Sequence, residues 1–115
     1  MQETLFPLTL SEYQTQALKT AIFPADTGVV YTTLGLAGEA AEIANKVKKI
    51  LRDNGGNVTL QHGQEIGKEI GDVLWYCAAL AAELGLDLGA VAEVNLAKLA
   101  SRAERGTLQG SGDSR

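Results

Sequence analysis

Hydrophobic positions recur every three or four residues along most of this chain, which is the period of an amphipathic α-helix. The pattern predicts four helices. The first, second and fourth cover about 10–21, 31–52 and 88–104, and the third begins between 59 and 64 and reaches 84. No segment shows the alternating pattern of a half-buried strand. In the two longest helices the apolar positions are Leu36, Ala40, Ile43, Val47, Ile50 and Leu51, and then Ile66, Ile70, Val73, Leu74, Cys77, Leu80, Ala81 and Leu84.

Polar and small residues mark where these helices begin and end. Thr9 opens a capping-box pattern in "TLSE", and Asp87 is a suitable N-cap for the last helix. Pro24 and Gly28 are expected to end the first helix and open a loop. The segment "DNGGN" at 53–57 tolerates positive φ values and is expected to stop the second helix.

Four helices with short connections predict an all-α, four-helix bundle-like fold in which the two long helices form a central hairpin. The 115 residues suit one domain, which we place at 1–105, followed by a Gly/Ser-rich tail at 106–115 that is expected to be irregular. The apolar flanks of the long helices exceed what one short chain covers. We therefore expect a homodimer or homotetramer.

Charge and cysteine content narrow the environment and the partners. The formal net charge is −4 without a basic stripe, so duplex nucleic acid is not an expected partner. No signal peptide and no apolar run of transmembrane length is visible, so no membrane association is expected. The single cysteine, Cys77, cannot form an internal disulfide, which fits a cytoplasmic protein.

Two carboxylate pairs stand out, each with a spacing of three residues. Glu39 and Glu42 lie in the second predicted helix, and Glu69 and Asp72 lie in the third. Each pair shares a helix face beside the apolar stripe, so an antiparallel hairpin would bring all four carboxylates together. Converging like charges favour a hard cation such as Mg²⁺. The alternative is a solvated helix face on which Glu42 pairs with Lys46.

A polar stripe on the last predicted helix suggests an anionic ligand. Asn95, Lys98 and Arg102 lie on one face, at i, i+3 and i+7. An amide and two cations suit a phosphate chain. A solvated helix exterior is the alternative.

The ordered set of ExxE, ExxD and NxxKxxxR motifs resembles the MazG-like family of all-α nucleoside triphosphate pyrophosphohydrolases. The segments "LGLAGEAAE" and "EIGDVLWYCAALAAELGL" carry the resemblance, which covers about residues 10–105. It implies an oligomeric enzyme that hydrolyses nucleoside triphosphates to monophosphate and pyrophosphate with Mg²⁺, for which Mn²⁺ could substitute. Such an activity suits the housecleaning of nucleotide pools.

The resemblance also assigns roles to residues. It implies Mg²⁺ ligation by Glu39, Glu42, Glu69 and Asp72, with Glu42 or Glu39 acting on the attacking water. It implies substrate contacts from Asn95, Lys98, Arg102, Lys46, Gln14, Gln16 and Trp75 or Tyr76. Of these, Trp75 has a core position as its alternative, and Gln14 and Gln16 have simple solvent exposure. Gly38 is expected to let a partner helix approach.

Two other functions remain open at the level of sequence. One is a base-selective dUTP or dCTP pyrophosphatase. The other is a non-enzymatic helical oligomerisation or regulatory module that retains the acidic pairs, against which the complete set of polar residues argues.

Overall fold

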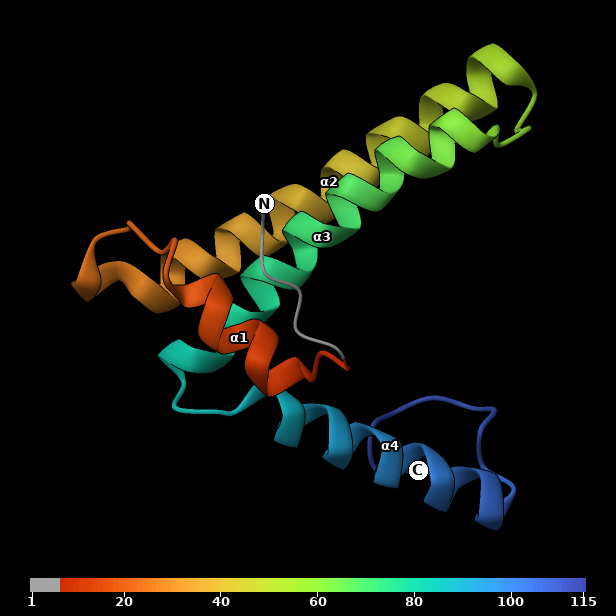
Figure 1. Cartoon of the computed structure of the whole chain (residues 1–115). Coiled ribbons are helices and arrows are strands. Elements are labelled where there is room, and N and C mark those ends of the chain that lie inside the picture. Colours follow the sequence, from red (N-terminus) through yellow and green to blue (C-terminus); the bar gives the residue numbers. More distant parts are fainter. Residues whose placement is uncertain (1–6) are drawn as a thin grey trace.

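A computed structural model describes residues 7–115, and all regular structure in that range is helical (Figure 1). The predicted all-α fold with four α-helices is confirmed, and residues 7–115 contain no strand. Residues 1–6 of the predicted domain lie outside the described residues. The elements are α1 (Leu10–Leu18), the short 3-10 helix η1 (Ala25–Thr27), α2 (Gly28–Asn54), α3 (Leu60–Glu83) and α4 (Leu88–Arg105).

Two helix boundaries differ from the predictions. The Thr9 hydroxyl caps α1 as expected, accepting from the backbone N–H of Glu12 at 3.0 Å, but α1 ends at Leu18 instead of near 21. The expectation that Gly28 opens a loop was wrong, because its φ of −55° and ψ of −47° are helical and it begins α2. The η1 turn leads directly into α2, so the break between the helices is short.

The predicted central hairpin of α2 and α3 is confirmed, with the two helices running antiparallel side by side (Figure 1). Gly55 ends α2 in the left-handed conformation, with a φ of 60°, as a C-cap glycine does. Thr59 then caps α3, and His62 completes a capping box by accepting the Thr59 backbone N–H on Nδ1 at 3.1 Å. This contact gives His62 a structural role that the sequence pattern did not indicate.

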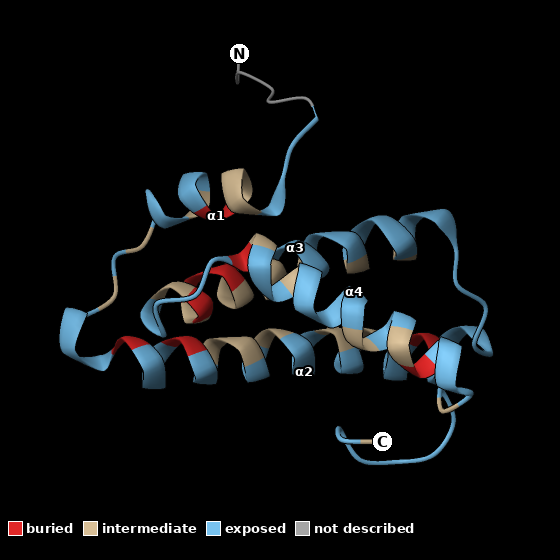
Figure 2. Ribbon diagram, turned by 90° about the horizontal axis from the view of Figure 1, so that it is seen from below, coloured by how far each residue is buried: buried red, intermediate tan, exposed pale blue. Residues whose placement is uncertain are grey.

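The buried core is small and lies where α1 crosses the end of α3 and the start of α4 (Figure 2). Ala78, Ala81 and Leu88 form the buried cluster, and Tyr13 and Leu74 pack against it. Small alanine side chains at this crossing let the helices approach closely. Most of the rest of the hairpin is half-buried or exposed, so this junction sets the position of α1.

Gln14 connects three elements inside this junction, with only 7% of the residue exposed. Its Nε2 donates to the carbonyl oxygens of Ala78 and Leu86, at 3.0 and 3.1 Å, and its Oε1 accepts from the backbone N–H of Leu88 at 3.0 Å. All the functional groups of the amide are therefore engaged with the backbone. Gln14 thus holds α1 onto α3 and α4 instead of being exposed to solvent, and its expected substrate contact stays a prediction.

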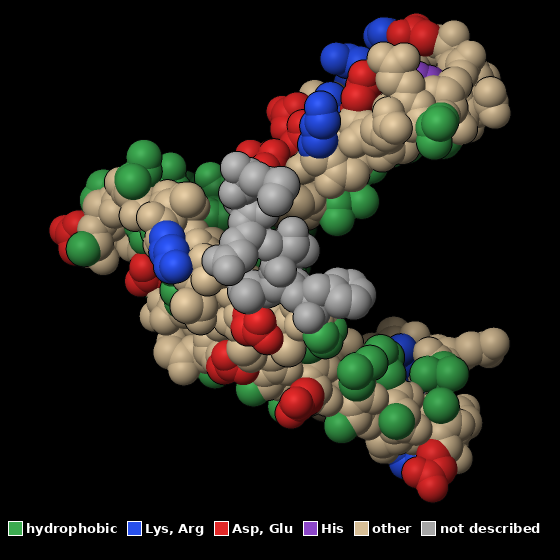
Figure 3. Space-filling view, viewed as in Figure 1, with side chains coloured by type: hydrophobic (Ala, Val, Ile, Leu, Met, Phe, Trp, Pro, Cys, Tyr) green, Lys and Arg blue, Asp and Glu red, His purple; other side chains and the backbone are tan. Residues whose placement is uncertain are grey.

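The helices do not close into a bundle within one chain. The radius of gyration is 17.0 Å, whereas a compact domain of about 100 residues has a value of about 13 Å. Within residues 7–115, α4 packs against α1 and α3 but not against α2. Hydrophobic side chains consequently face solvent along α4 and around the start of α2 (Figure 3), including Val94 at 70% and Leu34 at 68% exposure.

Replacing Gln14 by alanine should destabilise the fold by about 2–4 kcal/mol, because it removes three hydrogen bonds, two of them buried, that join α1 to Ala78, Leu86 and Leu88. Urea unfolding followed by circular dichroism at fixed protomer concentration measures the change. Gln16→Ala is the matched control, because Gln16 is exposed on the same helix and should change stability by no more than about 0.5 kcal/mol. Equal midpoints for the two variants would contradict the role given to Gln14.

Candidate functional site

Three of the four predicted carboxylates meet across the hairpin. Glu39 comes from α2, and Glu69 and Asp72 come from neighbouring turns of α3. One carboxylate oxygen from each lies within 4.8 Å of those of the other two. The spacing of three residues gives Glu69 and Asp72 a common face, and the antiparallel pairing places Glu39 opposite them.

The carboxylates around Glu39 disfavour its charged form. The hydrogen-bonding contact with Glu69 raises the pKa of Glu39 most, and desolvation and the charges of Asp72, Glu69 and Glu42 raise it further. A divalent cation would remove this repulsion. Oxygen ligands about 2.0–2.1 Å from Mg²⁺ lie at most about 4.2 Å apart, so a small closure of these side chains fits the ion.

Glu42 is exposed one helical turn beyond Glu39 and does not belong to the set of three oxygens. Its charge nevertheless contributes to the raised pKa of Glu39, which places it near the cluster. Glu42 is thus both near Glu39 and exposed to solvent. A carboxylate there can meet a water molecule.

An aromatic cavity of about 370 Å³ adjoins the carboxylates and shares Glu39 and Asp72 with them. Its lining comes from the loop after α1, the first half of α2 and the middle of α3. Flat rings provide much of this lining, and a planar ligand can therefore stack inside it. The lining residues are Thr20, Ile22, Phe23, Tyr31, Glu39, Asp72, Trp75 and Tyr76.

The four rings of this cavity hold one another in place. Phe23 stacks on Tyr31 with centroids 5.0 Å apart, and Trp75 meets Tyr76 edge to face at 5.0 Å. The indole N–H of Trp75 donates to the Ala17 carbonyl oxygen at 3.2 Å and to the Thr20 hydroxyl at 3.0 Å. The end of α1 thereby fixes the orientation of the indole ring.

The sequence pattern indicated Trp75 and Tyr76 but missed Phe23 and Tyr31. Tyr31 lies about two helical turns before Glu39, whereas Trp75 lies one turn after Asp72. In an antiparallel hairpin these offsets point to the same side of the carboxylates. The aromatic spacing was therefore a usable signal for Tyr31. Phe23 lies in a loop, and no periodic pattern could place it.

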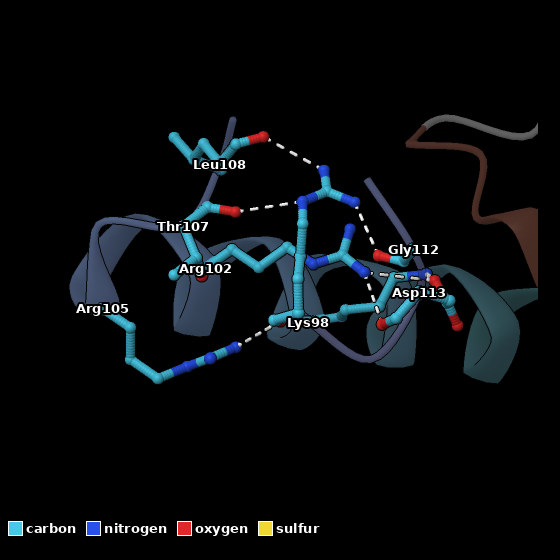
Figure 4. A network of polar contacts seen from close by, with 8 residues as sticks. Lys98, Arg102, Arg105, Thr107, Leu108, Gly112 and Asp113 are labelled. Atoms are coloured by element: carbon cyan, nitrogen blue, oxygen red, sulfur yellow. Dashed lines mark hydrogen bonds and ion pairs between the residues drawn. The ribbon is translucent and has the colours of Figure 1, made fainter. Parts of the chain in front are cut away.

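The predicted polar stripe lies on α4, which does not pack against α2 within residues 7–115. Asn95 is exposed, Lys98 is half-buried and Arg102 is buried, with 5% exposure. Lys98 Nζ lies 2.7 Å from Asp113 Oδ1, and Arg102 Nη2 donates to the Asp113 carbonyl oxygen at 2.6 Å (Figure 4). The cations of the stripe therefore hold the tail in this structure.

The tail folds back along α4 and is organised around one guanidinium group (Figure 4). Arg115 donates to the carbonyl oxygens of Thr107, Leu108 and Gly112, at 3.1, 3.0 and 2.7 Å. The predicted irregular conformation is observed, yet these contacts and Asp113 tie the segment to the helix. Arg102 Nε remains buried without a partner, as does the Thr107 hydroxyl.

Lys46 lies apart from the three carboxylate oxygens, one turn beyond Glu42. It lines a smaller cavity of about 230 Å³ toward the tip of the hairpin, with Lys49, Asp53, His62 and Glu65 among its neighbours. A phosphate contact from Lys46 would therefore come from the tip side of the carboxylate cluster.

Together these features define a helical protein with an oxygen-rich acidic cluster suited to a divalent cation, beside a cavity suited to a planar ligand. Residues 30–107 match the MazG nucleotide pyrophosphohydrolase domain, and the chain belongs to this family. The resemblance drawn from the ExxE, ExxD and NxxKxxxR motifs is thus confirmed.

A relative from a virus is similar over most of its length. The Gene 37 protein of Mycobacterium phage L5 is 50% identical over 109 residues, which cover 90% of this chain and 96% of the relative. No solved structure matches the chain. In the part of the chain that the structure describes, no helix combines the length and apolarity needed to cross a bilayer.

The Asp113 carboxylate should titrate at a lower pH than an ordinary aspartate. Lys98 and then Arg102 hold the pKa of Asp113 below its usual 3.8, so the contact is complete at neutral pH and is lost as pH falls through the depressed pKa. Carbon-detected NMR of the Asp113 carboxyl group measures this. Lys98→Gln should raise the pKa of Asp113 toward its usual value, whereas Lys68→Gln, at an exposed position on α3, should not change it. An unchanged pKa in Lys98→Gln would contradict the pairing.

Proposed function

We propose that this chain is a Mg²⁺-dependent nucleoside triphosphate pyrophosphohydrolase that releases a monophosphate and pyrophosphate. The observation that supports it is the junction of two features: three carboxylate oxygens within 4.8 Å of one another, and an aromatic cavity bordered by two of the same residues. A nucleotide needs both an ion-bound phosphate chain and a surface for its base. Cleaning of the nucleotide pool is a role that suits such an enzyme.

Glu39, Glu69 and Asp72 would hold Mg²⁺, with Mn²⁺ as a substitute and Glu42 as a further ligand. Oxygen donors are the ligands that this ion prefers, and the raised pKa of Glu39 reflects the excess of negative charge that a cation would offset. When bound, such an ion neutralises phosphate charge and lowers the pKa of an attacking water.

Glu42 is our choice for the residue that orients and deprotonates the water, because it is exposed beside the cluster. The water oxygen attacks the α-phosphorus and gives its proton to the carboxylate. The bond from the α-phosphorus to the bridging oxygen breaks, and pyrophosphate leaves with that oxygen. Glu39 would support the geometry from the adjacent turn of α2.

The base would stack in the aromatic cavity, against Trp75 or Tyr76. Stacking suits all bases because each has a π-face, so a broad range of nucleotides is the first expectation. The cavity shares Asp72 with the carboxylate cluster, so a base in the cavity would lie next to phosphates bound at the carboxylates. Selectivity for dUTP or dCTP is the narrower alternative within the same chemistry.

Phosphate contacts from Asn95 and Lys98 would come from a second copy of the chain. Within residues 7–115, α4 packs against α1 and α3 but not against α2, and it exposes Val94 and Leu96, at 70% and 65%. A homodimer or homotetramer would cover this apolar surface and complete the site. Arg102 would serve mainly by holding the tail, because its guanidinium group is buried and donates to Asp113.

A panel of ribo- and deoxyribonucleoside triphosphates should yield monophosphate and pyrophosphate with millimolar Mg²⁺, and chelation should stop turnover. Anion-exchange chromatography identifies the products. Glu39→Gln and Asp72→Asn should each lower kcat by at least about 10²-fold, with the helical circular dichroism unchanged. Glu104→Gln, on exposed α4, is the matched carboxylate control and should keep full activity.

The products of this panel decide between the proposals. Diphosphate plus orthophosphate would contradict attack at the α-phosphorus, and turnover of dUTP or dCTP alone would establish the selective enzyme. No turnover of any nucleotide would leave the helical oligomerisation module as the function.

Mixing two inactive variants tests whether the site spans two copies. Glu69→Gln removes one half of the proposed site and Lys98→Gln removes the other. If dimers form at random, about a quarter of wild-type activity should return, because half the dimers are mixed and each holds one intact site. Steady-state kinetics after co-refolding measures the recovery. Absence of recovery from a mixture shown to form mixed oligomers would place the whole site within one copy.

A further inference from the structure

We propose that Gly35 determines the size of base the aromatic cavity accepts, because its missing side chain gives the Tyr76 ring its place against α2. This inference rests on the nucleotide function proposed above. It assigns a specificity role to a residue outside the ExxE, ExxD and NxxKxxxR patterns and outside the lining of the cavity. Gly35 would act through Tyr76, without touching the nucleotide.

The contact between Gly35 and Tyr76 is direct. A Cβ atom added at Gly35 would come closer than 3.0 Å to the Cδ1, Cε1 and Cζ atoms of the Tyr76 ring. Those atoms belong to one rigid ring, so no small bend of a flexible chain end relieves the overlap. The ring of Tyr76 therefore lies on the α2 backbone at the position where other residues carry a side chain.

The surroundings of Tyr76 limit where its ring could move. Trp75 lies edge to face with it at a centroid distance of 5.0 Å, and Tyr31 lies at 6.5 Å. Burial raises the pKa of the Tyr76 hydroxyl, in keeping with a partly enclosed ring. Tyr76 also lines the cavity. In the proposal, a methyl group at position 35 displaces the ring toward the cavity and makes it smaller.

Helix propensity does not account for a glycine here, because glycine is among the least favourable residues for a helix interior. The same helix contains another glycine, Gly38, where an added Cβ would meet no atom within 4 Å. Alanine at either position raises helix propensity equally, but only alanine at 35 collides with the cavity wall. Gly38→Ala is therefore a matched control for Gly35→Ala.

A smaller cavity should penalise a two-ring purine more than a one-ring pyrimidine. Changes of one methylene in a binding pocket alter affinity by roughly 10- to 200-fold. We expect Gly35→Ala to weaken purine binding by about tenfold relative to pyrimidine binding, at the lower end of that range. Wild-type protein and Gly38→Ala should have the same ratio of purine to pyrimidine dissociation constants.

The probes are the α,β-methylene analogues of ATP and CTP, which resist cleavage at the proposed bond, titrated with Mg²⁺ into the full chain. Trp75 is the single tryptophan of the chain and lines the cavity, so its fluorescence reports binding without turnover. The measured quantity is the ratio of the two dissociation constants. Equal ratios in Gly35→Ala and Gly38→Ala would overturn the proposal.

A double-mutant cycle with Tyr76→Ala separates steric displacement from a general loss of structure. With the ring absent, adding Gly35→Ala should leave the analogue ratio and the circular dichroism unchanged. If Gly35→Ala alone folds poorly, recovery of folding in the double variant supports the same contact. A further shift of the ratio in the Tyr76→Ala background would count against it.

The two proposals fail in different ways. Binding with the expected ratios but without turnover would contradict the hydrolase function and leave the role of Gly35 intact. Turnover with identical ratios in both glycine variants would remove only the role of Gly35.

Discussion

The antiparallel packing of α2 against α3 is the contact on which the rest of the site depends. It brings three carboxylates within 4.8 Å of one another, an arrangement that the separate helices would resist through charge repulsion. The same pairing brings Tyr31 near Tyr76, with ring centroids 6.5 Å apart, so one register determines both the acidic cluster and the cavity. A shift of one helical turn would separate the carboxylates and dismantle the aromatic wall together.

Local patterns in the sequence were sufficient for the existence of the four helices and for the meeting of three of the four carboxylates. The three-residue spacing of Glu69 and Asp72 fixes a common face, and the hydrophobic period fixes which side of the helix packs. Gln14 shows where such reasoning ends, because its partners are backbone groups 64 to 74 positions away. An exposed and a buried glutamine look the same in one helical pattern, and only the crossing of α1 with α3 separates Gln14 from Gln16.

The stripe on α4 shows a different limit of prediction. Lys98 and Arg102 suit an anion in their spacing and charge, and the structure supplies one in Asp113 (Figure 4). A carboxylate within the chain and a phosphate outside it present similar oxygen acceptors. Spacing along one helix therefore predicts that an anion is bound, while the path of the tail decides which anion it is.

The docking of α1 has a consequence for the motions of the molecule. This helix has nine residues, too few to persist in water by itself, and the Gln14 amide contributes much of its attachment. Its last turn and Thr20 hold the Trp75 indole, so detachment of α1 would also release one wall of the cavity. Segments with few apolar contacts open locally well before the whole chain unfolds. In this protein, opening of the first helix would expose the cavity at the same time. The amide N–H groups of α1 and of the cavity wall should therefore exchange with solvent as one unit.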